Sequence, residues 1–393
     1  MSELEKLLDG VEVEWKPLGE IAELKRGRVM SKEYLAENAG KYPVYSSQTA
    51  NNGQIGKIDS FDFDGETVTW TTDGANAGTI FHRVGKFSIT NVCGLIKVKD
   101  TDKLDYKFLY YWLSIEAKKH VYSGMGNPKL MSNQVAKIPI PIPSLEIQQK
   151  IVDILDKFTK HTTELTAELT TELIARKQQY NYYREQLLSF GEGEVEWKSL
   201  GEVVIKSYSG STPKAGDPKY YNNGIIPWLR TQEVKFADIE KTEIKITDYA
   251  VKNTAVKWIP VNCVIIAISG ATAGRSAINK IPLTTNQHCL CLEINPKKAL
   301  YRYVFHWVSF NYENLKNLGQ GARNDLNSGI IKNYKIPVPP VEEQERIVSI
   351  LDKFDILTNS ISEGLPKEIE LRKKQYEYYR DLLLTFPKDN IES

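Results

Sequence analysis

The chain has 393 residues, of which 41% are hydrophobic and 26% are charged, and its formal net charge is +1. That length gives room for two or three ordinary domains with full cores and excludes a small disulfide-stapled scaffold. The near-zero charge neither favours nor excludes nucleic acid as a ligand, so the charge of each segment is more informative than the total.

The N-terminal ten residues lack the basic start and apolar core of a signal peptide, and the sequence contains no run of about 18 apolar residues. We therefore expect a soluble, cytoplasmic protein. Four cysteines lie in apolar, strand-like runs without CxxC spacing: Cys93, Cys263, Cys289 and Cys291. This pattern favours buried thiols over a disulfide framework or a zinc site.

Residues 1–143 are expected to form the first globular segment, with a net charge of 0. Short β-rich runs at Thr67–Thr72 and Leu95–Val98 are separated by turn signals such as Asn51-Asn52-Gly53, and a helical pattern covers Tyr106–Ser114. Alternating prolines at 139–143 close the segment. Because proline fixes φ and disfavours helix in the residue before it, they predict an extended exit from the domain.

Residues 144–190 are expected to form one long helix. Its apolar and aromatic positions recur mostly every three or four residues, as in a coiled coil. These positions are Ile151, Leu155, Phe158, Leu165, Leu169, Leu173, Tyr180, Tyr183, Leu187 and Phe190.

Within this helix, residues 162–173 contain three tetrads that each end in Glu-Leu. Adding or deleting one tetrad would shift the rest of the helix by about 6 Å and rotate it by about 40° past a full turn. That rotation is close to the twist of one DNA base pair, at about 10.5 base pairs per turn. The tetrads therefore could set a length in steps; alternatively, they form a threonine-rich solvated face with leucines in the helix seam.

The second half of the chain repeats the first. Residues 191–339 form a second expected globular segment, with net charge +6, and residues 340–386 a second long helix, followed by a tail at 387–393. Residues 140–190 align without a gap to 336–386 at a shift of 196, and about half of the aligned residues are identical. Gly364 and Pro366 interrupt the second helical pattern, which predicts a kink or a broken turn.

The identities extend into the globular segments. Glu-Val-Glu-Trp-Lys opens both of them, at Glu12 and Glu194, and the glycine-bounded motif at Gly74–Gly78 returns at Gly270–Gly274. Further β-rich runs at Cys263–Ile268 and His288–Ile294 match those of the first segment. Two similar scaffolds with different surface residues predict two similar tasks with different targets.

No catalytic motif stands out in the sequence. There is no GxxxxGK[ST] loop, dinucleotide fingerprint, HExxH or GxSxG motif. Glu14-Trp15-Lys16 and Glu196-Trp197-Lys198 have the Glu-x-Lys spacing of many metal nucleases, but they open each segment inside a repeated phrase, which favours a structural role.

Polar residues on loops are the remaining candidates for function. Arg and Lys can bind guanine or phosphate, and Asn and Gln can pair with adenine. In the first segment the candidate DNA-binding residues are Lys25, Arg26, Arg28, Asn76, Arg83, Lys86, Asn127 and Lys129. In the second they are Lys214, Arg230, Gln232, Arg275, Gln287, Arg323 and Asn324. The alternative for any one of them is a solvated surface residue.

Each half of the chain carries an EVEWKxLGE opening, an IPxP exit, an IVxILDKF helix start and an RKxQYxYYRxxLLxF helix end. With these motifs the chain resembles the specificity (S) subunits of type I restriction-modification systems over nearly its full length. The resemblance implies an α+β protein in which two mixed α/β target-recognition domains are separated by two long antiparallel coiled-coil helices, as a pseudo-two-fold internal repeat. Each domain would read one half of a bipartite site in double-stranded DNA, and the helices would set the spacer.

The same resemblance implies a non-catalytic subunit. It would join two methyltransferase (M) subunits, which bind S-adenosylmethionine, and restriction (R) subunits, which use ATP and Mg. The chain itself would bind no cofactor and no membrane. Tyr182 and Tyr378 lie off the helical stripe and are candidates for partner contacts, whereas Tyr180, Tyr183, Tyr376 and Tyr379 could equally pack the helices together.

Two other classes of protein stay open at this point. A non-catalytic coiled-coil adaptor with two protein-binding heads would share the helices and the lack of catalytic motifs, but gives no reason for a repeat that steps with the DNA twist. A self-contained methyltransferase or nuclease would need a catalytic motif in this chain.

Overall fold

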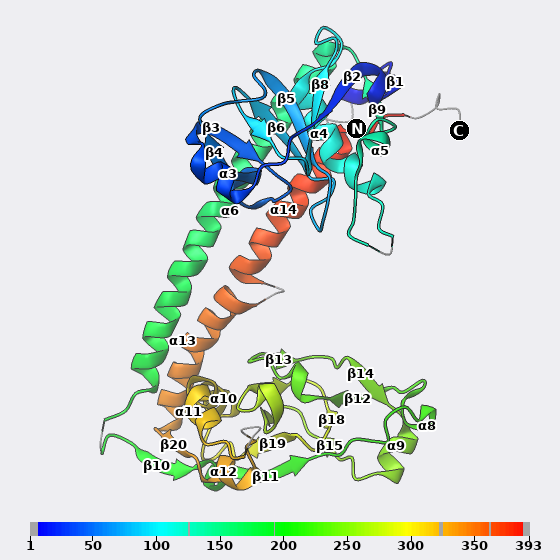
Figure 1. Ribbon diagram of the computed structural model, residues 1–393. Coiled ribbons are helices and arrows are strands. Elements are labelled where there is room, and N and C mark those ends of the chain that lie inside the picture. Colours follow the sequence, from blue (N-terminus) through cyan, green and yellow to red (C-terminus); the bar gives the residue numbers. More distant parts are fainter. Residues whose placement is uncertain (1–6, 125, 192, 322–324, 361–362, 388–393) are drawn as a thin grey trace. The chain divides into compact units, whose positions relative to one another are not determined.

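The computed structural model of the protein describes residues 7–387 apart from residues 125, 192, 322–324 and 361–362. The chain divides into two compact units: the first comprises residues 1–168 and 369–393, and the second residues 169–368. Each unit contains one globular part and segments of the long helices (Figure 1). Among the described residues, no helix combines the length and the apolar character needed to cross a membrane.

The globular part of the first unit contains three sheets among its described residues. The largest has four antiparallel strands in the order β2-β8-β5-β6, the second has the order β4-β3-β7, and the third pairs β1 with β9. The strands are β1 (Glu14–Pro17), β2 (Ala22–Arg26), β3 (Ala39–Tyr45), β4 (Gln54–Ile58), β5 (Glu66–Thr71), β6 (Ile80–Val84), β7 (Ser88–Ile89), β8 (Cys93–Val98) and β9 (Pro139–Ile142).

Helix α4 (Tyr106–Glu116) packs on the four-stranded sheet and forms the core of the first unit with it. The side chain of Asp105 accepts a hydrogen bond from the Phe108 amide (2.8 Å), so the helix begins with a capped first turn. The predicted strand runs and the predicted helix of this segment are confirmed in β5, β8 and α4. The short helices are α2 (Leu18–Ile21), α3 (Lys32–Glu37), η1 (Ala50–Gly53), η2 (Ala117–His120) and α5 (Ser132–Val135).

The second unit has the same plan with more strands. Its described sheets have the orders β11-β19-β16-β17-β13, β14-β12-β18-β15 and β10-β20. The strands are β10 (Glu196–Ser199), β11 (Val204–Ser209), β12 (Ile226–Leu229), β13 (Asp238–Ile239), β14 (Ile244–Ile246), β15 (Trp258–Ile259), β16 (Val264–Ala267), β17 (Ser276–Asn279), β18 (Leu283–Thr285), β19 (Cys289–Ile294) and β20 (Lys335–Val338).

Helix α10 (Tyr301–Phe310) covers β16 and β17 as α4 covers β5 and β6. The predicted strands at Cys263–Ile268 and His288–Ile294 are confirmed in β16 and β19. The remaining short helices are α7 (Leu200–Val203), α8 (Pro218–Tyr221), η3 (Thr231–Glu233), α9 (Asp248–Asn253), η4 (Gly270–Thr272), α11 (Tyr312–Asn317) and α12 (Ser328–Asn333).

The repeated opening phrase and the proline-rich exit of each globular part pair with each other. Trp15 lies opposite Pro141 in the β1–β9 ladder, and Trp197 lies opposite Pro337 in the β10–β20 ladder. A two-stranded ladder has only edge strands, where proline is tolerated because no second partner needs its missing N–H. The Glu-Trp-Lys phrase therefore closes each domain where the chain leaves it, which gives it a structural role.

The long helices have the predicted bounds to within a few residues. α6 runs without interruption from Leu145 to Leu188. The second is divided into α13 (Val341–Asn359) and α14, which begins at Gly364 with φ +74° and ends at Leu383. The predicted interruption at Gly364 is thus confirmed. The domain boundaries stay a prediction, because the division into compact units falls within α6 and α14.

Within each unit the helix segments pair antiparallel through equivalent aromatic residues. In the first unit Phe158 packs on Tyr379 with ring centroids 5.6 Å apart, and in the second Phe354 packs on Tyr183 at 5.6 Å. The shift of 196 residues exchanges these two pairs, so the repeat is a pseudo-two-fold one at the level of contacts. Tyr180 also stacks on Phe354, as predicted for a seam residue.

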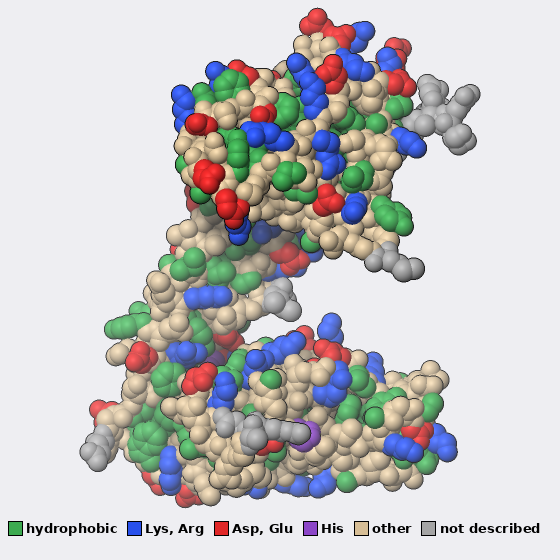
Figure 2. All heavy atoms as spheres, in the orientation of Figure 1, with side chains coloured by type: hydrophobic (Ala, Val, Ile, Leu, Met, Phe, Trp, Pro, Cys, Tyr) green, Lys and Arg blue, Asp and Glu red, His purple; other side chains and the backbone are tan. Residues whose placement is uncertain are grey.

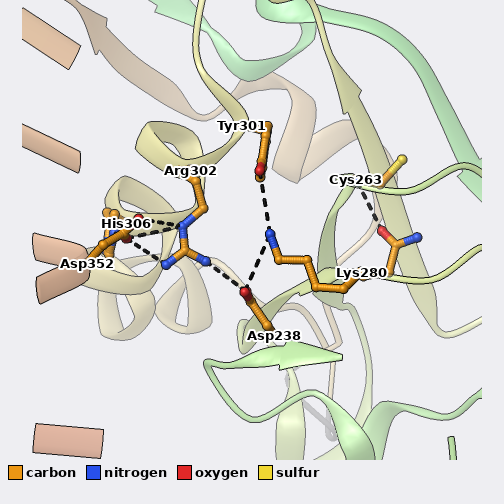
Figure 3. A network of polar contacts seen from close by, with 8 residues as sticks. Asp238, Cys263, Lys280, Tyr301, Arg302, His306 and Asp352 are labelled. Atoms are coloured by element: carbon orange, nitrogen blue, oxygen red, sulfur yellow. Dashed lines mark hydrogen bonds and ion pairs between the residues drawn. The ribbon is translucent and has the colours of Figure 1, made fainter. Parts of the chain in front are cut away.

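A polar network fastens each globular part to its helix. In the second unit Asp352 of α13 accepts hydrogen bonds from Arg302 (2.6 Å) and from His306 (2.6 Å) of α10 (Figure 3). In the first unit Asp156 of α6 binds Lys107 (2.5 Å) and Tyr111 (2.7 Å) of α4. Burial acts to raise the pKa of Asp352, but the hydrogen bonds from His306 and Arg302 outweigh it, so the pKa is lowered.

Candidate nucleic-acid interface

In the first unit, three loops and one hairpin meet where β2 and β5 end. We call residues 26–28, 71–78, 90–92 and 122–130 the first loop edge; residue 125 lies outside the described residues. The Thr72 amide donates to the Val92 carbonyl (3.1 Å), and the Leu130 amide donates to the Thr72 carbonyl (2.9 Å). Arg26 at the end of β2 reaches across to the Thr72 hydroxyl (3.3 Å) and the Asn91 carbonyl. Backbone contacts therefore hold these segments together.

The second unit builds the same arrangement from equivalent positions. The second loop edge comprises residues 209–212, 268–275, 285–288 and 320–326, of which 322–324 lie outside the described residues. The Ile268 amide donates to the His288 carbonyl (2.9 Å), and the Leu326 amide donates to the Ile268 carbonyl (2.8 Å). These bonds repeat those of Thr72 and Leu130. Both repeats thus present a loop surface on the same framework.

Glycine is required where β2 and β11 enter these edges. A Cβ atom on Gly27 would lie 2.0 Å from the Ile89 carbonyl oxygen, and one on Gly210 would lie 1.7 Å from the Thr285 carbonyl oxygen. Any side chain would push the strands apart there. Gly74, Gly78, Gly270 and Gly274 bound the repeated loop motif and have φ between +73° and +86°, which explains the motif by backbone geometry.

The structure brings some first-segment candidates together and separates others. Four of them lie on the first loop edge: Arg26, Asn76, Asn127 and Lys129. The backbone of Lys129 forms isolated antiparallel β-bridges with Asp73 and with Tyr122. Lys25, Arg28 and Lys86 are exposed but face carboxylates of their own domain. Their partners are Glu23 at 3.6 Å, Asp62 at 3.1 Å and Asp64 at 3.9 Å.

Arg83 is a correction to the predicted set. Its side chain is only 3% exposed, and its guanidinium lies 3.6 Å from the centroid of the Tyr45 ring. It donates to the Asn52 carbonyl (2.7 Å), in the turn where Asn51 and Asn52 have positive φ. Burial lowers its pKa. Arg83 therefore supports a turn from inside the domain, and its burial contradicts its placement on a DNA-contacting surface.

In the second unit Arg275 and Gln287 lie on the second loop edge. Arg230 and Gln232 follow β12 and share one carboxylate, since both donate to Glu243 (2.8 and 3.2 Å). Lys214 is exposed. Arg323 and Asn324 lie outside the described residues, so their predicted roles stay predictions. DNA contact by any of the exposed candidates likewise stays a prediction.

Sequence reasoning missed several polar residues of the second loop edge. Ser269 Oγ lies 2.8 Å from His288 Nδ1, and the Thr212 hydroxyl donates to Gln287 Oε1 (2.7 Å). The sequence contained a signal for His288 alone, because the second repeat has one residue more than the first at this point. The first repeat has only Val92 between Asn91 and Cys93, whereas the second has both Gln287 and His288 between Asn286 and Cys289.

These edges offer hydrogen-bonding groups and no catalytic constellation among the described residues. That part of the chain contains no group of three or more His, Cys, Asp or Glu side chains placed to hold a metal ion. The four cysteines are buried, as predicted, and burial raises the pKa of Cys93, Cys263 and Cys289 to about 12, so their thiols stay protonated. Amides, hydroxyls and cations on loops suit base and phosphate recognition.

Charge on the first unit is mixed rather than concentrated. Figure 2 shows Lys and Arg side chains interspersed with Asp and Glu on its visible face. This agrees with the net charge of 0 for residues 1–143. Affinity for phosphates at this unit must therefore come from individual loop cations or from a basic partner.

The comparisons with known proteins agree on one protein family. A family model described as the type I restriction modification DNA specificity domain matches the chain twice, over residues 10–175 and 192–371. The specificity subunit of the type I restriction enzyme EcoR124I/EcoR124II of Escherichia coli is 41% identical over 415 residues, covering 100% of this chain and 99% of the relative.

Solved structures share the fold at lower sequence identity. A type I restriction-modification system S subunit from M. genitalium matches with a TM-score of 0.55 at 18% identity, covering 99% of this chain and 100% of its own. A chain from a structure of type I restriction-modification complex assembly matches with a TM-score of 0.65 at 14% identity, covering 96% of this chain and 98% of its own. These likenesses confirm the α+β fold with an internal repeat.

Proposed function

The chain belongs to the type I restriction-modification DNA specificity family, and from that membership we propose that its two loop edges each read one half of a bipartite DNA sequence. It is a DNA-recognition subunit of a restriction-modification complex. In the proposed division of labour, the first loop edge contacts one half-site and the second loop edge the other. The length of the helices sets the number of unread base pairs between them.

One observation carries this proposal: the same loop framework is built twice, with different polar residues on it. Equivalent backbone hydrogen bonds support both edges, at Thr72 and at Ile268. Yet the first edge presents Arg26 and Lys129 where the second presents Ser209 and Asp325. A shared framework with exchanged side chains is what two readers of different sequences require, because base contacts specify and the scaffold only positions them.

We further propose that catalysis resides in partner subunits. In this proposal two M subunits bind S-adenosylmethionine and methylate adenine, R subunits supply cleavage driven by ATP with Mg, and the complex acts on cytoplasmic DNA. Tyr182 and Tyr378, which are 60% and 63% exposed on the helices, are the proposed contacts with the M subunits. Equivalent positions in the two repeats would give each M subunit the same docking residue.

The test is to co-express the chain with the M subunit of its own genome and to map modified adenines by single-molecule sequencing. The proposal predicts one bipartite motif with a fixed gap, which disappears when the chain is left out. A complex that forms and binds S-adenosylmethionine, yet adds no methylation at a bipartite motif, would contradict it.

A further inference from the structure

We propose that Gln287 is a specificity-determining residue that reads an adenine through its major-groove edge, and that Thr212, His288 and Ser269 are positioning residues that hold its amide. The inference rests on the proposed function, because it assumes that the second loop edge faces DNA. It adds the base that is read, the residue that reads it and the half-site in which it lies.

A chain of hydrogen bonds holds the Gln287 side chain at both ends of its amide. The Thr212 hydroxyl donates to Gln287 Oε1 (2.7 Å), and Gln287 Nε2 donates to His288 Nε2 (3.1 Å). Because His288 Nε2 accepts this bond, its proton lies on Nδ1, from which it donates to Ser269 Oγ (2.8 Å). An exposed glutamine is normally mobile, so this arrangement removes rotamer freedom before any ligand binds.

The amide retains half of its hydrogen-bonding capacity. A glutamine amide has two N–H donors and two lone pairs on its oxygen. Thr212 uses one lone pair and His288 uses one donor, and no other bond to this amide occurs in the described part of the chain. One donor and one lone pair remain free. Adenine presents the complementary pair in the major groove, with N7 as acceptor and the N6 amino group as donor.

The preference for adenine does not depend on which amide atom is oxygen. If the amide were turned over, the Thr212 hydroxyl would accept from nitrogen, and His288 Nε2 would donate to oxygen with the other tautomer. Ser269 can serve either tautomer, because a hydroxyl both donates and accepts. One donor and one lone pair would again remain free, so the same base is favoured.

The backbone beneath Gln287 is also fixed. Its carbonyl accepts a hydrogen bond from the Ser209 hydroxyl (3.2 Å), and the following His288 amide donates to Asn286 Oδ1 (3.1 Å). Asn286 is only 8% exposed, whereas Gln287 is exposed. The buried Asn286 thus fixes the backbone next to the exposed Gln287, and a fixed backbone is what a precise contact with a base needs.

The hydrogen-bonded arrangement around Gln287 belongs to the second repeat and not to the first. In the first repeat Val92 takes the place of His288, because its carbonyl accepts the equivalent backbone hydrogen bond, and Gln287 has no counterpart there. Valine at position 287 removes both hydrogen-bonding groups of the exposed amide, so it cannot make the bidentate contact. The first half-site should not respond to changes at Gln287.

The first experiment compares the methylation motifs of the wild-type complex and the complex with Gln287→Val. We expect one adenine position in the second half-site to become degenerate, while the first half-site and the gap stay the same. Discrimination at that position should fall by about 5- to 150-fold, the range for a bidentate base contact. An unchanged motif overturns the inference, as does degeneracy at several positions or uniform loss of methylation, which would indicate a structural role.

A second experiment tests the contact itself. Duplexes with 7-deazaadenine at the degenerate position lack the N7 acceptor, so the wild-type complex should bind them more weakly while the Gln287→Val complex should bind both duplexes equally. Equal losses for both complexes overturn the contact. Thr212→Val should weaken discrimination at the same position and at no other; discrimination that is unaffected, or affected elsewhere, overturns the positioning role.

These outcomes separate the inference from the function on which it rests. A wild-type complex without a bipartite motif overturns the proposed function and this inference with it. A wild-type bipartite motif that Gln287→Val leaves unchanged overturns this inference alone.

Discussion

At the scale of single residues, exposure decides which cations can reach DNA. Arg28 and Arg230 are paired with Asp62 and Glu243, but these pairs are partly exposed. Such pairs contribute at most about 1 kcal/mol, so a phosphate can replace the carboxylate at little cost. Arg83 is different, because it is buried and bonded to the backbone of a turn. It stabilises the first domain and is shielded from any ligand.

Replacing Arg83 with alanine should therefore affect stability. We expect Arg83→Ala to lower the free energy of local opening of β5 and β6 by about 1–3 kcal/mol, because the Asn52 carbonyl loses its donor and the stack on Tyr45 is lost. Hydrogen exchange of the intact chain measures this strand by strand. The exposed Lys86→Ala is the matched control and should change opening by less than about 0.5 kcal/mol. Equal protection in both variants would contradict the assigned role.

At the scale of elements, one aspartate on each long helix fastens the globular part beside it. Asp352 and Asp156 occupy equivalent positions in the repeated LDKF phrase. Asp352 binds an arginine and a histidine, while Asp156 binds a lysine and a tyrosine. The position is kept and its partners differ, so the two anchors should respond differently to loss of the carboxylate charge.

Asp352→Asn should loosen α10 from α13. The pKa of Asp352 is lowered in the folded protein, so folding favours its charged form. The stabilisation that this carboxylate provides is complete above the unfolded-state pKa of about 3.9. It is lost as the pH falls through the lower folded-state pKa. We expect a loss of about 1–2 kcal/mol near pH 7, measured by hydrogen exchange of both helices. The difference from wild type should vanish in acid. Glu345→Gln, on the exposed face of α13, is the control; an equal effect there would contradict the anchor.

The tetrads lie within the continuous part of α6, so a change in their number can be absorbed without breaking the helix. Deleting Thr166–Leu169 should shorten the unread gap of the DNA motif and leave both half-sites as they are. Methylation mapping of the co-expressed complex measures both. Altered half-sites would show that the tetrads do more than set a length.

At the scale of the whole molecule, local patterns predicted much of the fold. The internal repeat, the long helices, the interruption at Gly364 and the strand runs of β5, β8, β16 and β19 could be predicted, because helix and strand periodicity and proline geometry act over a few residues. The pairing of β1 with β9 could not be predicted, since it joins residues more than 120 positions apart through backbone bonds. The sheet orders escaped prediction for the same reason.

The candidate site was less predictable than the fold. Residue type alone placed Arg83 with the surface cations, yet Tyr45 and Asn52, which are distant in sequence, enclose it. Residue type identified Gln287 but not the orientation of its amide, which depends on Thr212 and Ser269 from two other loops. Contacts between separate loops decide both cases, and the sequence pattern does not encode them locally.

The central claim is that each globular part reads its own half of the DNA site. The most direct measurement replaces residues 1–143 with the corresponding segment of the 41% identical Escherichia coli relative and maps the methylation motif of the resulting complex. We predict a new first half-site, with the second half-site and the gap unchanged. A motif in which both halves change, or in which neither does, would contradict the claim.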